Sequence, residues 1–134
     1  MANVKDIEGI GPVLGGKLER AGIVTVEALL ENGATRSGRA NIARETGIPE
    51  SQILEFVNMA DLMRVKGVGA EFAELLKAAG VDTIKELRTR NAENLQQKME
   101  QVHAEKGLTR RVPSLDMVKD FIAQAGKTDP SITY

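Results

Sequence analysis

The feature of this sequence that most constrains its fold is a short motif that occurs twice, as IEGIGP at Ile7–Pro12 and as VKGVGA at Val65–Ala70. When the two copies are aligned at a constant offset of 58 residues, they continue to agree without a gap. Seven positions are identical: Gly9/Gly67, Gly11/Gly69, Leu18/Leu76, Ala21/Ala79, Gly22/Gly80, Thr25/Thr83 and Leu29/Leu87. Because the identities fall on glycines and expected core positions, the sequence predicts an internal duplication.

The composition favours packed helices. Apolar residues make up 42% of the 134 residues and aromatic residues only 3%, so the core must be aliphatic. Sandwiches and barrels usually draw on β-branched and aromatic residues, which makes them poor alternatives. There are no cysteines, which excludes disulfides, thiolate zinc sites and cysteine nucleophiles.

Capping residues and glycine stops divide each copy into helices. In the first copy the predicted helices run from Asn3 to Ile7, from Pro12 to Gly22, from Thr25 through Leu30, over NIARETG, and from Pro49 to Arg64. In the second copy they run from Ala70 to Gly80, from Thr83 onward, from Ala92 to Lys106, and from Ser114 through Ile122. We expect an all-α fold of two units, residues 1–63 and 64–126, packed into one compact helical domain with a flexible tail at 127–134.

Each glycine pair lies in a connection too short for a relaxed loop. We expect Gly9 and Gly11 to adopt backbone angles closed to other residues and Ile10 between them to point inward. The main-chain N–H groups that begin the following helix then face outward and form a small positive concavity that suits a phosphate oxygen. The same prediction applies to the second turn, at Gly67, Val68 and Gly69.

The pattern resembles the helix-hairpin-helix motif, in which Gly–apolar–Gly is followed one helical turn later by a small residue, here Gly15 and Ala73. Two such motifs joined by a helix resemble the paired domain of DNA repair and recombination proteins. The stretches LLKAAGVDTIKELRTRNAENL and RRVPSLDMVKDFIAQA are similar to a bacterial stand-alone family that is a domain of unknown function, and this likeness covers nearly the whole chain. The resemblance implies a helix-hairpin-helix fold that binds the DNA backbone without regard to sequence, often with a monovalent cation at the hairpin.

Some charged residues near the turns favour phosphate binding and others oppose it. Lys17, Arg64 and Lys66 would supply positive charge, and the pair Arg110 and Arg111 would add phosphate contacts. Against these stand three acids, Glu8, Glu71 and Glu74, of which the last two could bond the same N–H groups that a phosphate needs. The net charge is −1, so the molecule lacks an overall basic field. Two hairpins would supply roughly 2–4 phosphate contacts, which predicts weak, salt-sensitive binding.

The sequence therefore predicts sequence-independent nucleic-acid binding, with double-stranded DNA as the partner. The alternative is a protein-interaction or assembly module that kept the fold and lost DNA binding, which the acidic pI of about 5.9 favours. No nucleophile–base pair, metal cluster, P-loop or dinucleotide fingerprint is recognisable, so we predict no enzyme activity, no catalytic residue, and no cofactor or metal beyond that cation. The N-terminus MANVKDIEG has no apolar run and no stretch suits a membrane span, so we expect a cytoplasmic protein without a membrane partner.

Overall fold

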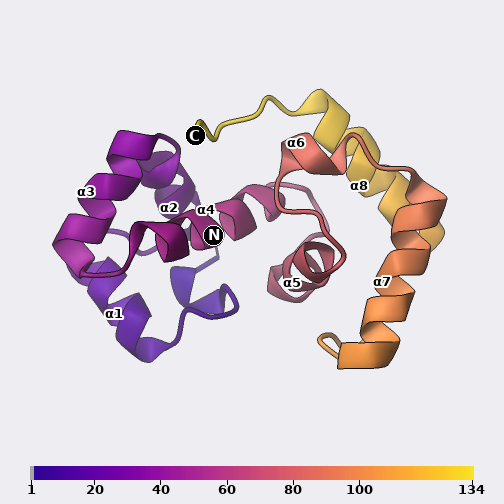
Figure 1. The fold of residues 1–134 in the computed structure, drawn as a ribbon, viewed down its shortest axis with the longest axis horizontal. Coiled ribbons are helices and arrows are strands. Elements are labelled where there is room, and N and C mark those ends of the chain that lie inside the picture. The colour runs from indigo at the N-terminus through magenta and orange to yellow at the C-terminus, as the bar shows by residue number, and fades with distance from the viewer. Residues whose placement is uncertain (1) are drawn as a thin grey trace. The chain divides into compact units, whose positions relative to one another are not determined.

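The computed structural model describes residues 2–134, and every regular element in that range is a helix (Figure 1). The expected all-α fold is confirmed. A short 3-10 helix, η1 (Val4–Asp6), comes first, and the α-helices follow in the order α1 (Pro12–Arg20), α2 (Val26–Gly33), α3 (Arg36–Thr46), α4 (Glu50–Leu62), α5 (Ala70–Ala78), α6 (Ile84–Leu87), α7 (Ala92–Lys106) and α8 (Leu115–Lys127).

The chain divides into two compact units. The first unit holds the described residues up to Asp61 together with Ser131–Tyr134, and the second unit is Leu62–Pro130. The sequence predicts this boundary after residue 63, and the structure has it after Asp61. Within residues 2–134 no helix combines the length and apolarity that crossing a bilayer requires.

Short polar side chains begin most of these helices, as the sequence predicts. The Thr25 hydroxyl accepts a hydrogen bond from the Ala28 N–H at 3.0 Å, and the Thr83 hydroxyl accepts one from Glu86 N–H at 3.3 Å. Asn91 and Ser114 cap α7 and α8 in the same way. These bonds satisfy N–H groups that have no partner inside the helix, so the starts of these helices are set locally.

In the first unit, α1 and α2 both pack against α3. Its core is aliphatic, with one buried phenylalanine from α4. The fully buried side chains of this unit include Val4, Ile7, Leu18, Leu29, Ile53 and Val57.

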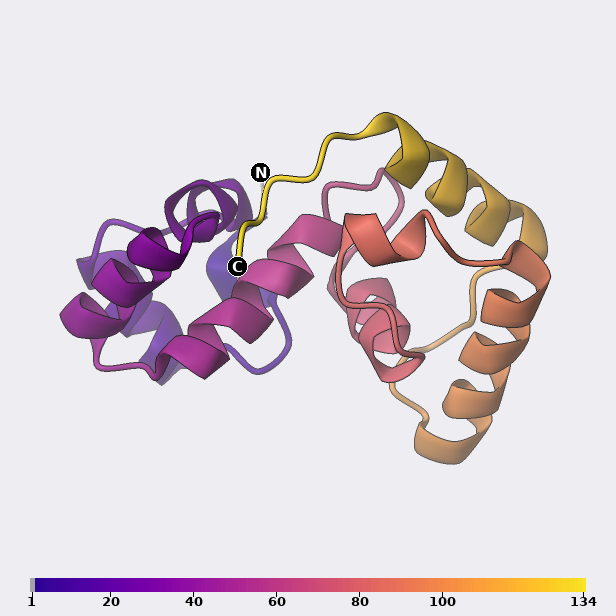
Figure 2. The ribbon, with the colours of Figure 1, turned by 45° about the horizontal axis from the view of Figure 1, so that its top comes forward.

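In the second unit, α5 packs against α7, and α8 packs against both α6 and α7, as Figures 1 and 2 both show. Its fully buried side chains include Leu75, Leu76, Ile84, Leu87, Leu95, Met99 and Val118. Phe72 and Phe121 meet here with their ring centroids 6.3 Å apart.

Two segments differ from the sequence-based expectation. Helix α3 begins at Arg36, earlier than NIARETG predicts, because the Thr35 hydroxyl accepts from the Gly38 N–H at 3.1 Å and caps it. The predicted flexible tail also has specific contacts: α8 continues through Lys127, and the Thr133 N–H donates to the Ala34 carbonyl at 2.8 Å.

Candidate functional site

The two glycine turns have the same backbone geometry. Gly9 and Gly67 have φ values of 93° and 98°, which L side chains rarely adopt. The second glycine of each pair is different: Gly11 (φ −86°, ψ −170°) and Gly69 (φ −94°, ψ −168°) have extended backbone that any residue can adopt. The expectation that both glycines need special angles is therefore wrong for Gly11 and Gly69, which are instead the N-cap residues of α1 and α5.

The apolar residue between the glycines fixes each turn to the core. Ile10 and Val68 are only 3% and 5% exposed, as predicted. The Ile10 N–H donates to the Ile7 carbonyl at 3.0 Å, and the Val68 N–H donates to the Val65 carbonyl at the same distance. Each turn is thus closed by one hydrogen bond and one buried side chain.

The helices that follow both turns begin without a side-chain cap. Their N-cap residues, Gly11 and Gly69, have no side chain and make no side-chain capping hydrogen bond. The first bonds inside the helices are Gly15 N–H to Gly11 carbonyl, at 2.8 Å, and Ala73 N–H to Gly69 carbonyl, at 2.9 Å. The N–H groups before them have no partner inside the helix, and the macrodipole makes this end positive.

The second turn offers more of these donors than the first. In α1 they are the N–H groups of Gly11, Val13 and Leu14, because Pro12 has none. In α5 they are those of Gly69, Ala70, Glu71 and Phe72. The second helix start therefore has one more main-chain N–H group without a partner inside its helix than the first.

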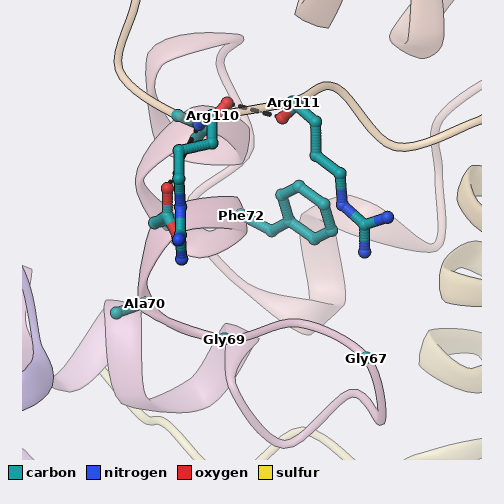
Figure 3. A pocket seen from close by; sticks show the side chains of 8 residues that line it. Gly67, Gly69, Ala70, Phe72, Arg110 and Arg111 are labelled. Atoms are coloured by element: carbon teal, nitrogen blue, oxygen red, sulfur yellow. Dashed lines mark hydrogen bonds and ion pairs between the residues drawn. The ribbon is translucent and has the colours of Figure 1, made fainter.

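Beside the start of α5 lies an open cavity of about 650 Å³. Its lining includes five residues that the sequence analysis singled out, Gly67, Gly69, Glu71, Arg110 and Arg111, and three that it did not, Ala70, Phe72 and Thr109. Figure 3 shows Arg110 and Arg111 extending from one loop on either side of Phe72, above the turn with Gly67 and Gly69. Two guanidinium groups and an uncapped helix start therefore converge on one space.

Arg110 and Arg111 are held differently. The Arg111 guanidinium carbon lies 5.8 Å from the centre of the Phe72 ring, within cation–π range. The Thr109 hydroxyl donates to the Arg111 carbonyl at 2.6 Å and shapes the loop. The sequence gives no signal for either role. Phe72 contacts Arg111, which lies far along the chain, and Thr109 acts through the local geometry of its loop.

Glu71 binds Arg110 and not the N–H groups at the start of α5. Its two carboxylate oxygens accept from the Arg110 backbone N–H and from the Arg110 guanidinium, each at 3.2 Å. These hydrogen bonds, with the nearby charges of Arg110 and Arg111, lower the pKa of Glu71 below its usual value. An anion in the cavity must compete with this carboxylate for Arg110.

Of the other three basic residues that the sequence predicts as phosphate contacts, two lie near the second turn and one lies away from both turns. Lys66 is exposed in the second turn, where Gln124 of α8 holds its backbone: the Lys66 N–H donates to Gln124 Oε1 at 2.8 Å and Gln124 Nε2 donates to the Lys66 carbonyl at 3.0 Å. Arg64 is also exposed near this turn. Lys17 lines a separate depression with Arg20, Ala21, Glu45 and Thr46, at the far end of α1 from Gly11.

The described residues contain no cluster of three or more histidine, cysteine, aspartate or glutamate side chains that could hold a metal ion. A comparison with curated proteins found no match, and one with solved structures found none. A family model for a domain of unknown function, DUF4332, matches residues 8–128, which include both turns and the Arg110–Arg111 loop. The chain belongs to the DUF4332 family.

Proposed function

We propose that this protein binds nucleic-acid backbones, with double-stranded DNA as the ligand, independently of base sequence. The observation that carries the proposal is the pair of helix starts that follow a tight glycine turn and lack a side-chain cap. Helix N-termini of this kind bind phosphate oxygens through main-chain N–H groups. Their matching geometry at Gly9 and Gly67 supports both the helix-hairpin-helix resemblance and the inferred duplication.

The second turn is the main contact in this proposal. The helix after it has one more N–H group without an acceptor inside the helix than α1 has. Arg110 and Arg111 lie beside this helix start. Residues 64–134 also carry twelve Lys and Arg against ten Asp and Glu, whereas residues 1–63 carry six against nine. The first turn has fewer such N–H groups, because Pro12 has none, and contributes a weaker phosphate contact.

Binding is expected to be weak and strongly salt-dependent. Each phosphate contact contributes about −0.9 to the slope of log K against log salt, and two hairpins supply roughly 2–4 contacts. Glu71 reduces the affinity further because it already occupies Arg110.

A substitution at Gly69 tests the proposal without disturbing the fold. Its backbone is extended and a Cβ atom would meet nothing within 4 Å. Gly69→Asp places a carboxylate at the N-cap, where it satisfies the helix N–H groups and stabilises α5. Gly69→Ala adds a Cβ atom and leaves these groups available, so it is the matched control.

The measurement is fluorescence anisotropy of a labelled random duplex, titrated with each protein at low and moderate salt. We expect the natural protein and Gly69→Ala to bind alike, and Gly69→Asp to bind at least about tenfold more weakly, as the loss of a charge-assisted contact predicts. Equal affinity of all three proteins would contradict the assignment of the site.

A second function has one observation in its favour. Val13 is 71% exposed on the first turn of α1, where a phosphate-binding surface gains nothing from an apolar side chain. A protein-interaction module would use such a residue as a contact. If the natural protein binds no duplex even at low salt, this second function is the one that the structure supports.

A further inference from the structure

Arg39 is a buried charged residue away from the glycine turns. It lies in the second turn of α3 and is only 4% exposed. A guanidinium keeps its charge in proteins, so its burial is unfavourable unless hydrogen-bond acceptors surround it. The groups that accept hydrogen bonds from Arg39 therefore indicate the role of this side chain.

Those acceptors are main-chain carbonyls. Arg39 Nη1 donates to the carbonyls of Gly33 and Ala34, at 2.9 and 3.1 Å, at the end of α2. Arg39 Nη2 donates to the carbonyl of Thr133 at 2.6 Å, and the Thr133 N–H in turn donates to the Ala34 carbonyl at 2.8 Å. Both main-chain groups of Thr133 are thus bound by the first unit, to which Ser131–Tyr134 also belongs.

The residue after Thr133 is held through its ring. The Arg39 guanidinium carbon lies 5.9 Å from the centre of the Tyr134 ring. Tyr134 also lines a depression of about 330 Å³ with Arg36, Arg39, Glu50, Ser51 and Leu54. Figure 2 shows the end of the chain beside α4, which supplies the last three of these residues.

The second unit shows that packing alone does not require an arginine here. Arg39 and Met99 lie at the same distance before Gly47 and Gly107, the left-handed glycines that end α3 and α7. Met99 is fully buried at its position. A methionine therefore fills this core position in the second unit. In the first unit the position holds Arg39, and one of its acceptors, the Thr133 carbonyl, comes from the tail.

We propose that Ala34, Arg39 and the first turns of α4 form a receptor for an extended peptide segment, and that the chain's own Ser131–Tyr134 is its resident occupant. The site recognises the N–H and C=O of one residue and the aromatic ring of the next. It makes no use of the Thr133 side chain beyond a long 3.5 Å contact of its hydroxyl with Ala34. Its ligand class is an extended backbone followed by an aromatic residue.

The first test follows the tail in the full chain. Tyr134 is the only tyrosine and there is no tryptophan, so intrinsic fluorescence at tyrosine wavelengths reports the tail alone. Thr133→Pro removes the N–H that Ala34 accepts and changes no core residue, whereas Ser131→Pro makes the same kind of change at an exposed residue of the same segment. Time-resolved anisotropy should decay with overall tumbling in the natural protein and in Ser131→Pro, and should gain a fast component in Thr133→Pro. A fast component of equal size in all three proteins would overturn the proposal.

The second test supplies the segment in trans. The probe is a fluorescein-labelled peptide with the sequence of residues 128–134 and an amidated end, titrated with full-length proteins. Thr133→Pro, whose own tail is released, should bind it at least about tenfold more tightly than the natural protein, because a tethered tail competes at millimolar effective concentration. Arg39→Met, which copies the buried methionine of the second unit, should stay folded by circular dichroism and bind no peptide.

The outcomes are separable from those of the DNA titration, since no residue of this receptor lies at a glycine turn. A Thr133→Pro protein that binds no peptide would contradict the proposal. So would a folded Arg39→Met protein that binds the peptide as tightly as Thr133→Pro does.

Discussion

At the scale of single residues, the two left-handed glycines determine the geometry of the turns. An L side chain in this backbone region is disfavoured by about 1–2 kcal/mol. A Cβ atom at Gly67 would also approach the Phe121 ring to 3.0 Å, whereas one at Gly9 would lie 3.4 Å from the Phe56 ring, an ordinary contact. Phe121 is buried and has little room to move.

We therefore expect Gly67→Ala to destabilise the protein more than Gly9→Ala, which should lose about 1–2 kcal/mol. Gly47→Ala is the control, because Gly47 has a φ of 76° with nothing within 4 Å of its Cβ position, so it reports the backbone strain alone. Urea unfolding followed by circular dichroism gives the three values. Equal losses at Gly67 and Gly47 would show that the Phe121 contact has no effect.

Glu71 makes stability depend on pH in a defined direction. Because Arg110 lowers its pKa in the folded protein, ionised Glu71 favours folding above its ordinary pKa, and this contribution is lost as the pH falls through the lowered value. Glu71→Gln should be slightly less stable than the natural protein at neutral pH, and the gap should close in acid. Urea unfolding across this pH range measures it, with Glu105→Gln, at an exposed residue of α7, as a control for the change in net charge. A gap that persists unchanged in acid would contradict the assigned ion pair.

Sequence patterns predict residues that act on near neighbours and miss those that act at a distance. The capping role of Thr25, Asn91 and Ser114 is readable because each accepts from an N–H three residues on. Gln124 acts on the backbone of Lys66, 58 residues away, and leaves no local signal. The same holds for Arg39 and the tail, whose contact depends on the tertiary fold.

At the scale of elements, the caps of α2 and α6 can be compared directly. Thr25 and Thr83 occupy matching positions and each accepts from the third N–H of its helix. Thr→Ala at either position should cost about 1 kcal/mol, and Thr→Ser should restore most of it because the hydroxyl is kept. Thermal unfolding of the four single variants measures this. A loss in Thr→Ser as large as in Thr→Ala would show that packing of the methyl group matters instead of the cap.

The existence of the helices follows from the sequence, while some of their limits do not. The apolar spacing and the glycine stops predict all the helices from α1 to α8. The start of α3 is missed because TRSGRA carries few apolar residues, so only the Thr35 cap marks it. The approach of Phe56 to Gly9, and of Phe121 to Gly67, also lies beyond sequence patterns, because it depends on how α4 and α8 pack.

At the scale of the whole molecule, the charge does not indicate a nucleic-acid-binding protein. The net charge is −1, so any attraction to DNA must come from local groups at the turns. The sequence predicts which residues form those turns, and the structure adds the cavity that joins the second turn to Arg110 and Arg111. The family match covers both turns and adds no activity, so the function has to be measured on this chain.

The most direct measurement is a titration of ¹⁵N-labelled protein with a random-sequence duplex, followed by the amide resonances in two-dimensional NMR. The account predicts that the amides of Gly69, Ala70, Glu71 and Phe72 shift most, that those of Gly11, Val13 and Leu14 shift less, and that all the shifts shrink as salt is added. Duplexes of different sequence should give the same pattern. If these amides stay unshifted while the duplex is present in excess at low salt, or if only resonances remote from both turns move, the central claim is wrong.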